Sequence, residues 1–240
     1  MNAPLDTGRF FFVGFPGTEL DRETREVLLR LRPGGIILFD RNLDDVEQLT
    51  HLIRELRGML PEALFTVDAE GGKVDRFKKI LGPSIGGAAL ARHPAGLAYE
   101  SGRWLGHGLA LFGIDLDLAP TVDLDRGEKH NALDGRYLGR TPEEVTERAR
   151  AFLHGLASAG VGGCLKHFPG LGGASEDTHL EHAPVYLPRS ELVTDLQPFL
   201  ELGREAGAVM VAHASYPAYD HDHRPATLSG PILRGLLRDQ

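Results

Sequence analysis

The feature of the sequence that most constrains the fold is an alternation of short, mostly apolar runs with stretches of helical periodicity. The runs occupy residues 10–14, 35–39, 64–67, 114–119, 161–168 and 208–214. Short apolar strands separated by helices are typical of a parallel sheet that is covered on its faces. The pattern therefore predicts an α/β protein built from repeated strand–helix units.

The stretches between the runs carry recognisable helix signals. One helical stripe is apolar and consists of Val46, Leu49, Leu52, Ile53 and Leu56. Residues 141–144 read Thr-Pro-Glu-Glu, which predicts a helix start with a capping box and a proline in the first turn. Ser229 is placed to cap a last helix with an apolar face. These signals put helices between the predicted strands.

Two architectures accommodate such units, a TIM-type (β/α)8 barrel and a doubly wound sheet. The first five runs each end in polar residues, and barrels place their chemistry at that end of the strands. Six runs are present instead of eight, and an open sheet of six strands would leave two edges exposed. We therefore predict a (β/α)8 barrel that is truncated after about six βα units. Residues 1–240 are expected to form a single barrel domain whose C-terminal strands are missing.

Charge and composition exclude several classes of partner. The formal net charge is −8 and no run rich in Lys and Arg is present, which argues against nucleic acid. The apolar stretch near the N-terminus covers only residues 10–15, which is too short to span a membrane. Cys164 is the single cysteine, so an intramolecular disulfide is impossible. The single cysteine fits a reducing compartment, and we expect no nucleic-acid and no membrane partner.

The strongest candidate site follows the fifth apolar run. The sequence Lys-His-Phe-Pro-Gly-Leu-Gly begins at Lys166, and a Glu-Asp-Thr-His stretch ends at His179. Lys166 and His167 can hydrogen-bond several hydroxyl groups of a ligand. Asp177 is spaced to orient and polarise the imidazole of His179 for acid–base catalysis. The alternative interpretation is a glycine-rich turn with exposed polar side chains.

Two further polar segments follow the third and fourth runs. Asp68 ends the third run, where its carboxylate can accept hydrogen bonds from vicinal hydroxyls, and Arg76 can close the same pocket. Arg136 lies in a long polar stretch after the fourth run and is a candidate substrate clamp. The alternatives are a strand-end carboxylate that caps a turn and an arginine that holds its loop through a salt bridge.

Eleven histidines raise the question of a metal site. His221 with His223, and His179 with His182, are spaced as metal ligands can be. Neither pair matches a tight zinc signature. We therefore predict no metal and no cofactor.

The motifs as a set resemble glycoside hydrolase family 3, in particular its cytoplasmic β-N-acetylglucosaminidases, or beta-hexosaminidases. The resemblance rests on GGIILFDRN, VDAEGGKVDRF, LAPTVDLDRG, RYLG, KHFPG with the DTH that follows, and MVAHASYPAYD with PATLS. It runs along nearly the whole chain in the family's order. Ala69, Lys73, Leu171 and the order of Asp134 and Gly135 depart from the family pattern, but none of these changes removes a named catalytic group.

The resemblance implies a role for each candidate residue. The residues that would bind N-acetylglucosamine are Asp68, Arg76, Arg136, Lys166 and His167. His179 would be the general acid/base, supported by Asp177. The family mechanism retains the anomeric configuration, and its nucleophilic aspartate, on a seventh strand, is expected beyond residue 240.

The implied function is hydrolysis of terminal β-N-acetylglucosamine from peptidoglycan fragments in cell-wall recycling, with N-acetylglucosamine-containing muropeptides as the carbohydrate substrate. Because no residue of the chain matches the nucleophile, residues 1–240 alone are expected to be hydrolytically inactive. Three alternatives stay open. They are a non-catalytic fragment that only binds sugar, a β-glucosidase of the same family, and an N-acetylglucosamine phosphorylase.

Overall fold

The computed structural model describes residues 6–127, 133–174 and 184–239. The main sheet consists of β1 (Phe12–Val13), β2 (Gly35–Leu38), β3 (Leu64–Val67), β6 (Leu116–Asp117), β7 (Gly162–Phe168) and β8 (Ala208–Val211). A separate antiparallel hairpin consists of β4 (Ala69–Gly71) and β5 (Val74–Asp75). The α-helices are α1 (Arg22–Leu31), α2 (Val46–Met59), α3 (Lys78–Leu81), α4 (Gly87–Leu90), α5 (Ala95–Leu111), α6 (Pro142–Ser158) and α7 (Arg189–Leu202). Shorter helical segments are η1 (Thr7–Phe10), η2 (Asp40–Asn42), η3 (Ala226–Leu228) and the π-helical η4 (Pro231–Arg238).

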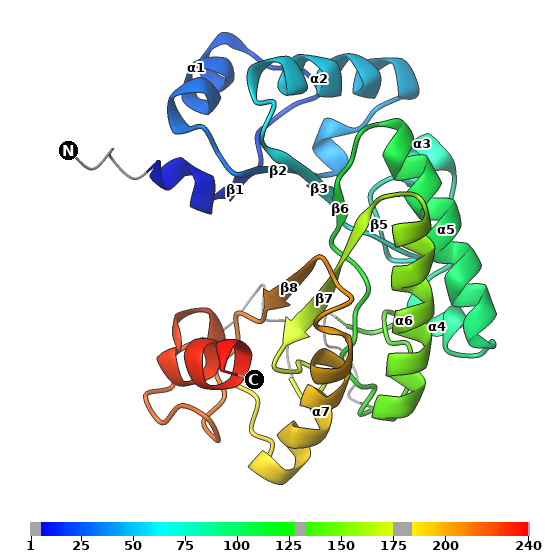
Figure 1. Ribbon diagram of the computed structural model, residues 1–240, viewed down its shortest axis with the longest axis vertical. Helices are drawn as coiled ribbons and strands as arrows, with labels where there is room; N and C mark the ends of the chain where they lie inside the picture. Colours follow the sequence, from blue (N-terminus) through cyan, green and yellow to red (C-terminus); the bar gives the residue numbers. More distant parts are fainter. Residues whose placement is uncertain (1–5, 128–132, 175–183, 240) are drawn as a thin grey trace.

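The six strands of the main sheet are all parallel and lie in the order β1-β2-β3-β6-β7-β8. After β1, each strand of this sheet therefore pairs with the sheet strand before it, with the β4–β5 hairpin standing between β3 and β6 in the chain. A doubly wound sheet requires a point where the strand order reverses, and this sheet has none. Figure 1 shows the sheet curving, with the large helices on its outer side. The prediction of a partial (β/α)8 barrel is confirmed.

Each predicted run contains one strand of the sheet; β3 has the bounds of its run, and the other five strands are shorter than theirs. The β4–β5 hairpin was not expected from the sequence, and no sequence signal marked the position of helix α5 between the third and fourth runs. Helix α5 escapes a propensity argument because it carries four glycines, each unfavourable inside a helix. The structure gives the reason for one of them: a Cβ on Gly102 would lie 2.2 Å from the carbonyl oxygen of Phe152 in α6. The glycine lets the two helices pack closely.

The predicted helix starts are present with small differences. The Thr141 side chain accepts a hydrogen bond from the amide of Glu144 at 3.3 Å. The Glu144 carboxylate reaches back to the amide of Arg140 at 2.9 Å, one residue earlier than in a standard capping box. Ser229 Oγ accepts a bond from the amide of Ile232, as expected, but the helix that follows is π-helical. Val46, predicted on the apolar stripe of α2, is the first residue of the helix and is exposed, whereas the other four stripe residues are buried.

The apolar core has two parts, because strand side chains alternate between the faces of the sheet. Ile36, Leu38, Phe65 and Val67 belong to the large cluster that the helices cover. A smaller cluster is formed by Leu116, Leu118 and Cys164, with Ile37, Ala208 and Met210 packed against it. The six-stranded sheet is thus a wall between two apolar layers.

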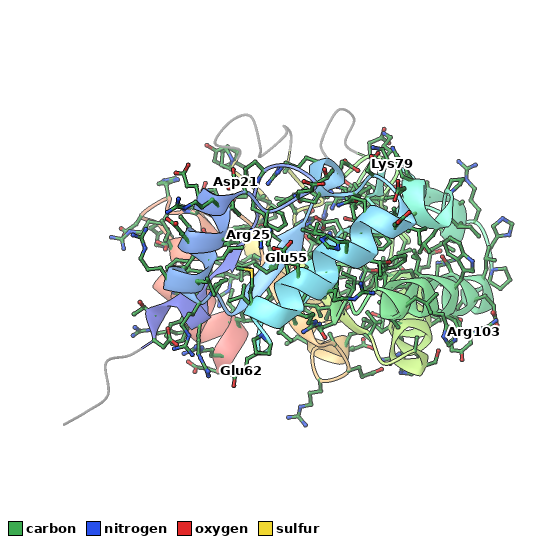
Figure 2. The ribbon with its side chains drawn as sticks, turned by 90° about the horizontal axis from the view of Figure 1, so that it is seen from above. Asp21, Arg25, Glu55, Glu62, Lys79 and Arg103 are labelled. Atoms are coloured by element: carbon green, nitrogen blue, oxygen red, sulfur yellow. The ribbon has the colours of Figure 1, made fainter. Side chains whose placement is uncertain are left out.

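Helices α1 and α2 lie side by side outside the sheet, and Figure 2 shows Arg25 of α1 pointing toward Glu55 of α2, with which it forms an ion pair. Within the described ranges, none of the helices combines the length and the hydropathy needed to cross a membrane.

Candidate functional site

The candidate site lies at the carboxyl ends of neighbouring strands. Asp68 directly follows β3, and Lys166 and His167 lie near the end of β7. Arg136 reaches the same place from the segment that precedes α6. Parallel strands direct their carboxyl ends to one edge of a barrel, where barrel enzymes carry their chemistry. The structure therefore brings together four of the five residues predicted to bind sugar.

Glu70 is the centre of this cluster. Lys166 Nζ lies 2.7 Å from Asp68 Oδ1 and 2.5 Å from Glu70 Oε1. Arg136 holds the same carboxylate with two hydrogen bonds, from Nη2 to Oε1 at 2.8 Å and from Nε to Oε2 at 2.9 Å. Thr121 Oγ1 also donates to Oε2 at 2.9 Å. One carboxylate thus joins a lysine, an arginine and a hydroxyl from three different segments of the chain.

Burial and charge act in opposite directions on the acidity of this cluster. The side chains of Lys166, Glu70 and Arg136 are 2%, 5% and 8% exposed. Burial alone would raise the pKa of Glu70, but the neighbouring Lys166 and Arg136 outweigh it and lower the pKa to about 2. Burial would lower the pKa of Lys166, but Glu70 and Asp68 raise it above its usual value. The cluster is therefore charged at neutral pH.

His167 is held by a second buried carboxylate. Its Nδ1 lies 2.7 Å from Asp123 Oδ2, and its backbone amide donates to the same carboxylate at 3.1 Å. The amide of Leu171 donates to Asp123 Oδ1 at 2.7 Å. A carboxylate accepts hydrogen bonds, so Nδ1 carries the proton and Nε2 faces Arg136 Nη2 at 3.4 Å. Asp123 thereby fixes both the ring of His167 and the turn that follows β7.

Arg76 has a different environment from the other four residues. Its backbone amide donates to the carbonyl of Asp68 at 3.2 Å, which ties the β4–β5 hairpin to the end of β3. Its guanidinium pairs with Asp40, with Nη1 at 2.5 Å from Oδ2. The sequence interpretation, in which Arg76 closes the pocket around Asp68, stays a prediction; the structure shows the guanidinium in contact with Asp40.

The predicted acid/base residues, His179 and Asp177, lie outside the described residues, as does His182. In the described part of the chain, no group of three or more His, Cys, Asp and Glu side chains is arranged to hold a metal ion.

The cluster has a part that reaches solvent, Asp68 and His167, and a buried charged part, Lys166, Glu70 and Arg136. The side chains of Asp68 and His167 are 18% and 14% exposed, so each reaches solvent. Lys166 is buried, and two of its three N–H donors are directed at Asp68 and Glu70. Fixed donors and acceptors of this kind suit a ligand that carries several adjacent hydroxyl groups.

Sequence reasoning missed Glu70 and Asp123 as parts of the site, although both stand inside quoted motifs. The signal for Glu70 was its spacing, because residues two apart on an extended chain share a face and Asp68 was already a candidate. Asp123 follows Thr121 by two residues in the same way. Neither can be assigned a partner from sequence, because the partners are distant in the chain: 44 positions separate Asp123 from His167, and 66 separate Glu70 from Arg136.

Comparison with known proteins supports a single family. The model of the glycosyl hydrolase family 3 N-terminal domain matches residues 8–240. A protein named beta-hexosaminidase from Methylococcus capsulatus is 37% identical over 230 residues, which cover 93% of this chain and 68% of the relative.

Solved structures give the same result. The family 3 β-N-acetylglucosaminidase from Paenibacillus sp. FPU-7 superposes with a TM-score of 0.91 at 35% identity, covering 97% of this chain and 46% of that one. NagZ from Neisseria gonorrhoeae, in complex with N-trifluoroacetyl-D-glucosamine, superposes with a TM-score of 0.86 at 35% identity, covering 94% of this chain and 69% of that one. The chain thus spans less than half of one relative and about two thirds of the other two.

A half-barrel with an ionised cluster at its strand ends, similar over nearly its whole length to sugar-cleaving enzymes, defines a barrel-type glycoside hydrolase domain. The match of residues 8–240 to a single family model is specific. The chain belongs to glycosyl hydrolase family 3 and carries the N-terminal domain of that family.

Proposed function

We propose that this domain binds the terminal N-acetylglucosamine of peptidoglycan fragments and forms part of a retaining β-N-acetylglucosaminidase that acts in cell-wall recycling. The observation that carries the proposal is the cluster of Asp68, Lys166 and His167 around Glu70 at the strand ends. Relatives named beta-hexosaminidase, and a related structure with a bound N-acyl glucosamine, support the choice of sugar.

The roles of the residues follow from their contacts. Asp68 accepts hydrogen bonds from vicinal sugar hydroxyls while Lys166 holds its carboxylate in place. His167 presents Nε2 to the sugar because Asp123 fixes its ring. Arg136 keeps Glu70 ionised, and Arg76 anchors the hairpin that follows Asp68. Preorganised donors and acceptors spend little free energy on ordering when the sugar binds.

In the proposed reaction, His179 is the general acid/base and Asp177 supports it. A nucleophilic aspartate on a seventh strand attacks the anomeric carbon while His179 protonates the leaving oxygen. The same histidine then activates water, which releases the sugar with its configuration retained. The ordinary pKa of a histidine lies near neutral pH, which suits a group that must both donate and accept a proton. Most glycosidases use a pair of carboxylates instead.

The test is to incubate the protein, produced from its intact gene, with muropeptides that carry terminal β-N-acetylglucosamine. We expect release of N-acetylglucosamine whose first-formed anomer is β, observed by proton NMR. Parallel reactions with β-glucosides and with added phosphate separate the alternatives. Cleavage of β-glucosides in preference, or formation of a sugar phosphate, would contradict the proposal.

The cytoplasmic location implied by the family resemblance is also a proposal. It is tested by fractionating cells that express the tagged protein from its own promoter. Recovery of the tag with a cytoplasmic marker is expected, and recovery with the cell envelope would contradict it.

A further inference from the structure

A fully buried carboxylate lies beside the candidate site without belonging to it. Asp117 is the last residue of β6 and is 0% exposed. Its Oδ1 accepts a hydrogen bond from the backbone amide of Ala69 at 3.0 Å. None of the roles proposed above uses Asp117.

The position of this hydrogen bond is what makes it informative. The parallel ladder between β3 and β6 pairs Val67 with Asp117, and its last described bond joins the amide of Leu118 to the carbonyl of Val67 at 2.8 Å. Beyond that pair the chain leaves the sheet for the β4–β5 hairpin. A buried amide at such a departure point needs a new acceptor, and the side chain of Asp117 supplies one to Ala69.

The residues on either side of Ala69 are the two carboxylates of the cluster. Asp68 Oδ1 and Glu70 Oε1 bind the same lysine nitrogen, Lys166 Nζ, at 2.7 Å and 2.5 Å. Both distances depend on the path of the backbone through Ala69, because a shift of this residue moves its two neighbours together. A single hydrogen bond to the Ala69 amide is therefore well placed to set the geometry of the cluster.

We propose that Asp117 is a positioning residue for sugar binding: its side chain fixes the Asp68-Ala69-Glu70 backbone through the Ala69 amide, so that Asp68 meets the sugar in its productive orientation. This inference rests on the proposed function of the site. Asp117 acts through Ala69 and does not touch the sugar.

The charge of Asp117 is not required for this role. Burial raises the pKa of Asp117 well above its usual value, and the nearby Asp68 and Glu70 raise it too, while the Ala69 bond and Lys166 oppose the change. Within the described part of the chain, Oδ2 has no hydrogen-bond partner. A single uncharged acceptor oxygen therefore suffices for the bond to the Ala69 amide, and the asparagine side chain, which has the same shape as aspartate, carries such an oxygen.

The chain offers a matched control on the same strand pair. Asp115 stands two residues before Asp117, so the two side chains project from the same face of the extended chain. Its Oδ2 accepts a hydrogen bond from the amide of Phe65 at 2.7 Å. It also pairs with Arg57 at 2.5 Å. This bond lies at the opposite end of β3 from Asp68. We therefore expect that loss of the Asp115 side chain removes a similar bond and leaves the site unaltered.

The test measures the affinity for N-acetylglucosamine by calorimetric titration in Asp117→Asn, Asp117→Leu and Asp115→Leu proteins, with the melting temperature of each. We expect Asp117→Asn to bind within about twofold of the unaltered protein, and Asp117→Leu to bind about tenfold more weakly because its site is misaligned. Asp115→Leu should melt at a lower temperature but keep its affinity. Equal affinity in Asp117→Leu, or equal losses in the Asn and Leu variants, would overturn the inference.

Two further measurements keep the outcome interpretable. Asp68→Asn tests the proposed function itself: if it binds as tightly as the unaltered protein, the site assignment fails, whereas a weak Asp68→Asn with a normal Asp117→Leu removes only the role of Asp117. If Asp117→Leu does not fold, amide hydrogen exchange in the unaltered protein tests whether the Ala69 amide is bonded to Asp117. The Ala69 amide should exchange as slowly as amides within β3, and rapid exchange would refute its bond to Asp117.

Discussion

Glu70→Gln is the substitution that most sharply tests the charged cluster. Glutamine keeps the shape of the side chain but imitates the protonated acid. The pKa of Glu70 is about 2 in the folded protein and 4.5 for an unperturbed glutamate, a difference that corresponds to about 3 kcal/mol. We therefore expect Glu70→Gln to lower the free energy of unfolding by about 3 kcal/mol at pH 7. The figure is the loss of attraction to Lys166 and Arg136 net of the burial of Glu70.

The pH dependence fixes the sign of this effect. A depressed pKa means that the folded state holds its proton more weakly than the unfolded state, so the stabilisation is present above pH 4.5 and is lost as the pH falls through about 2. Urea unfolding from pH 7 to pH 2 should show the gap between the unaltered and Glu70→Gln proteins closing over that window.

A matched control separates burial from charge alone. Glu26 of α1 pairs with Arg22 at 2.8 Å, but its side chain is 65% exposed, and exposed pairs contribute about 0.5 kcal/mol or less. Glu26→Gln should therefore change the free energy of unfolding little at any pH. If Glu70→Gln lowers the free energy of unfolding by less than about 1 kcal/mol, or if its difference from the unaltered protein does not depend on pH, then Glu70 is not the ionised partner of Lys166 and Arg136 described above.

Three other predictions follow from particular contacts. Burial raises the pKa of Asp195 to about 6 despite its pairing with Arg126 at 3.1 Å, so the stability that its protonated form contributes is present below pH 3.8 and is lost as the pH rises through about 6. Urea unfolding should therefore show Asp195→Asn to be more stable than the unaltered protein by about 2–3 kcal/mol at pH 7.5 and equally stable at pH 3.5. Asp123→Asn should change the tautomer of His167, seen by nitrogen NMR of the imidazole, and weaken sugar binding by about tenfold or more; an unchanged ring spectrum would contradict the assignment. In the intact gene product, His179→Ala should impair substrates with poor leaving groups far more than activated aryl glycosides, and equal losses would argue against an acid role.

The strand positions could be predicted from sequence because they depend on local patterns. The run at 64–67 became β3 with the same bounds, and the helix start at Thr141 is capped as the Thr-Pro-Glu-Glu pattern indicates. The β4–β5 hairpin could not be found in this way. It depends on Gly71, which has a φ of +84° and would place a Cβ 2.2 Å from the carbonyl oxygen of Ile85. The sequence shows the glycine but not the backbone that passes beside it.

The chemistry of the site was only partly visible in the sequence. Asp68, Lys166 and His167 stand in motifs at strand ends, so their convergence could be predicted from the barrel alone. Lys166 was expected to face a ligand, whereas the structure surrounds its ammonium group with Asp68 and Glu70 and leaves its side chain 2% exposed. A long-range ion pair has no local sequence signature, so the supporting role of Glu70 required coordinates.

The central claim is that this cluster binds N-acetylglucosamine, and the most direct test is a crystal structure of the protein with that sugar bound. We predict sugar hydroxyl oxygens within hydrogen-bonding distance of the Asp68 carboxylate and of Lys166 Nζ or His167 Nε2, with the Glu70–Arg136 pair unchanged. A sugar bound only elsewhere on the protein, at a concentration that saturates binding in solution, would contradict the claim.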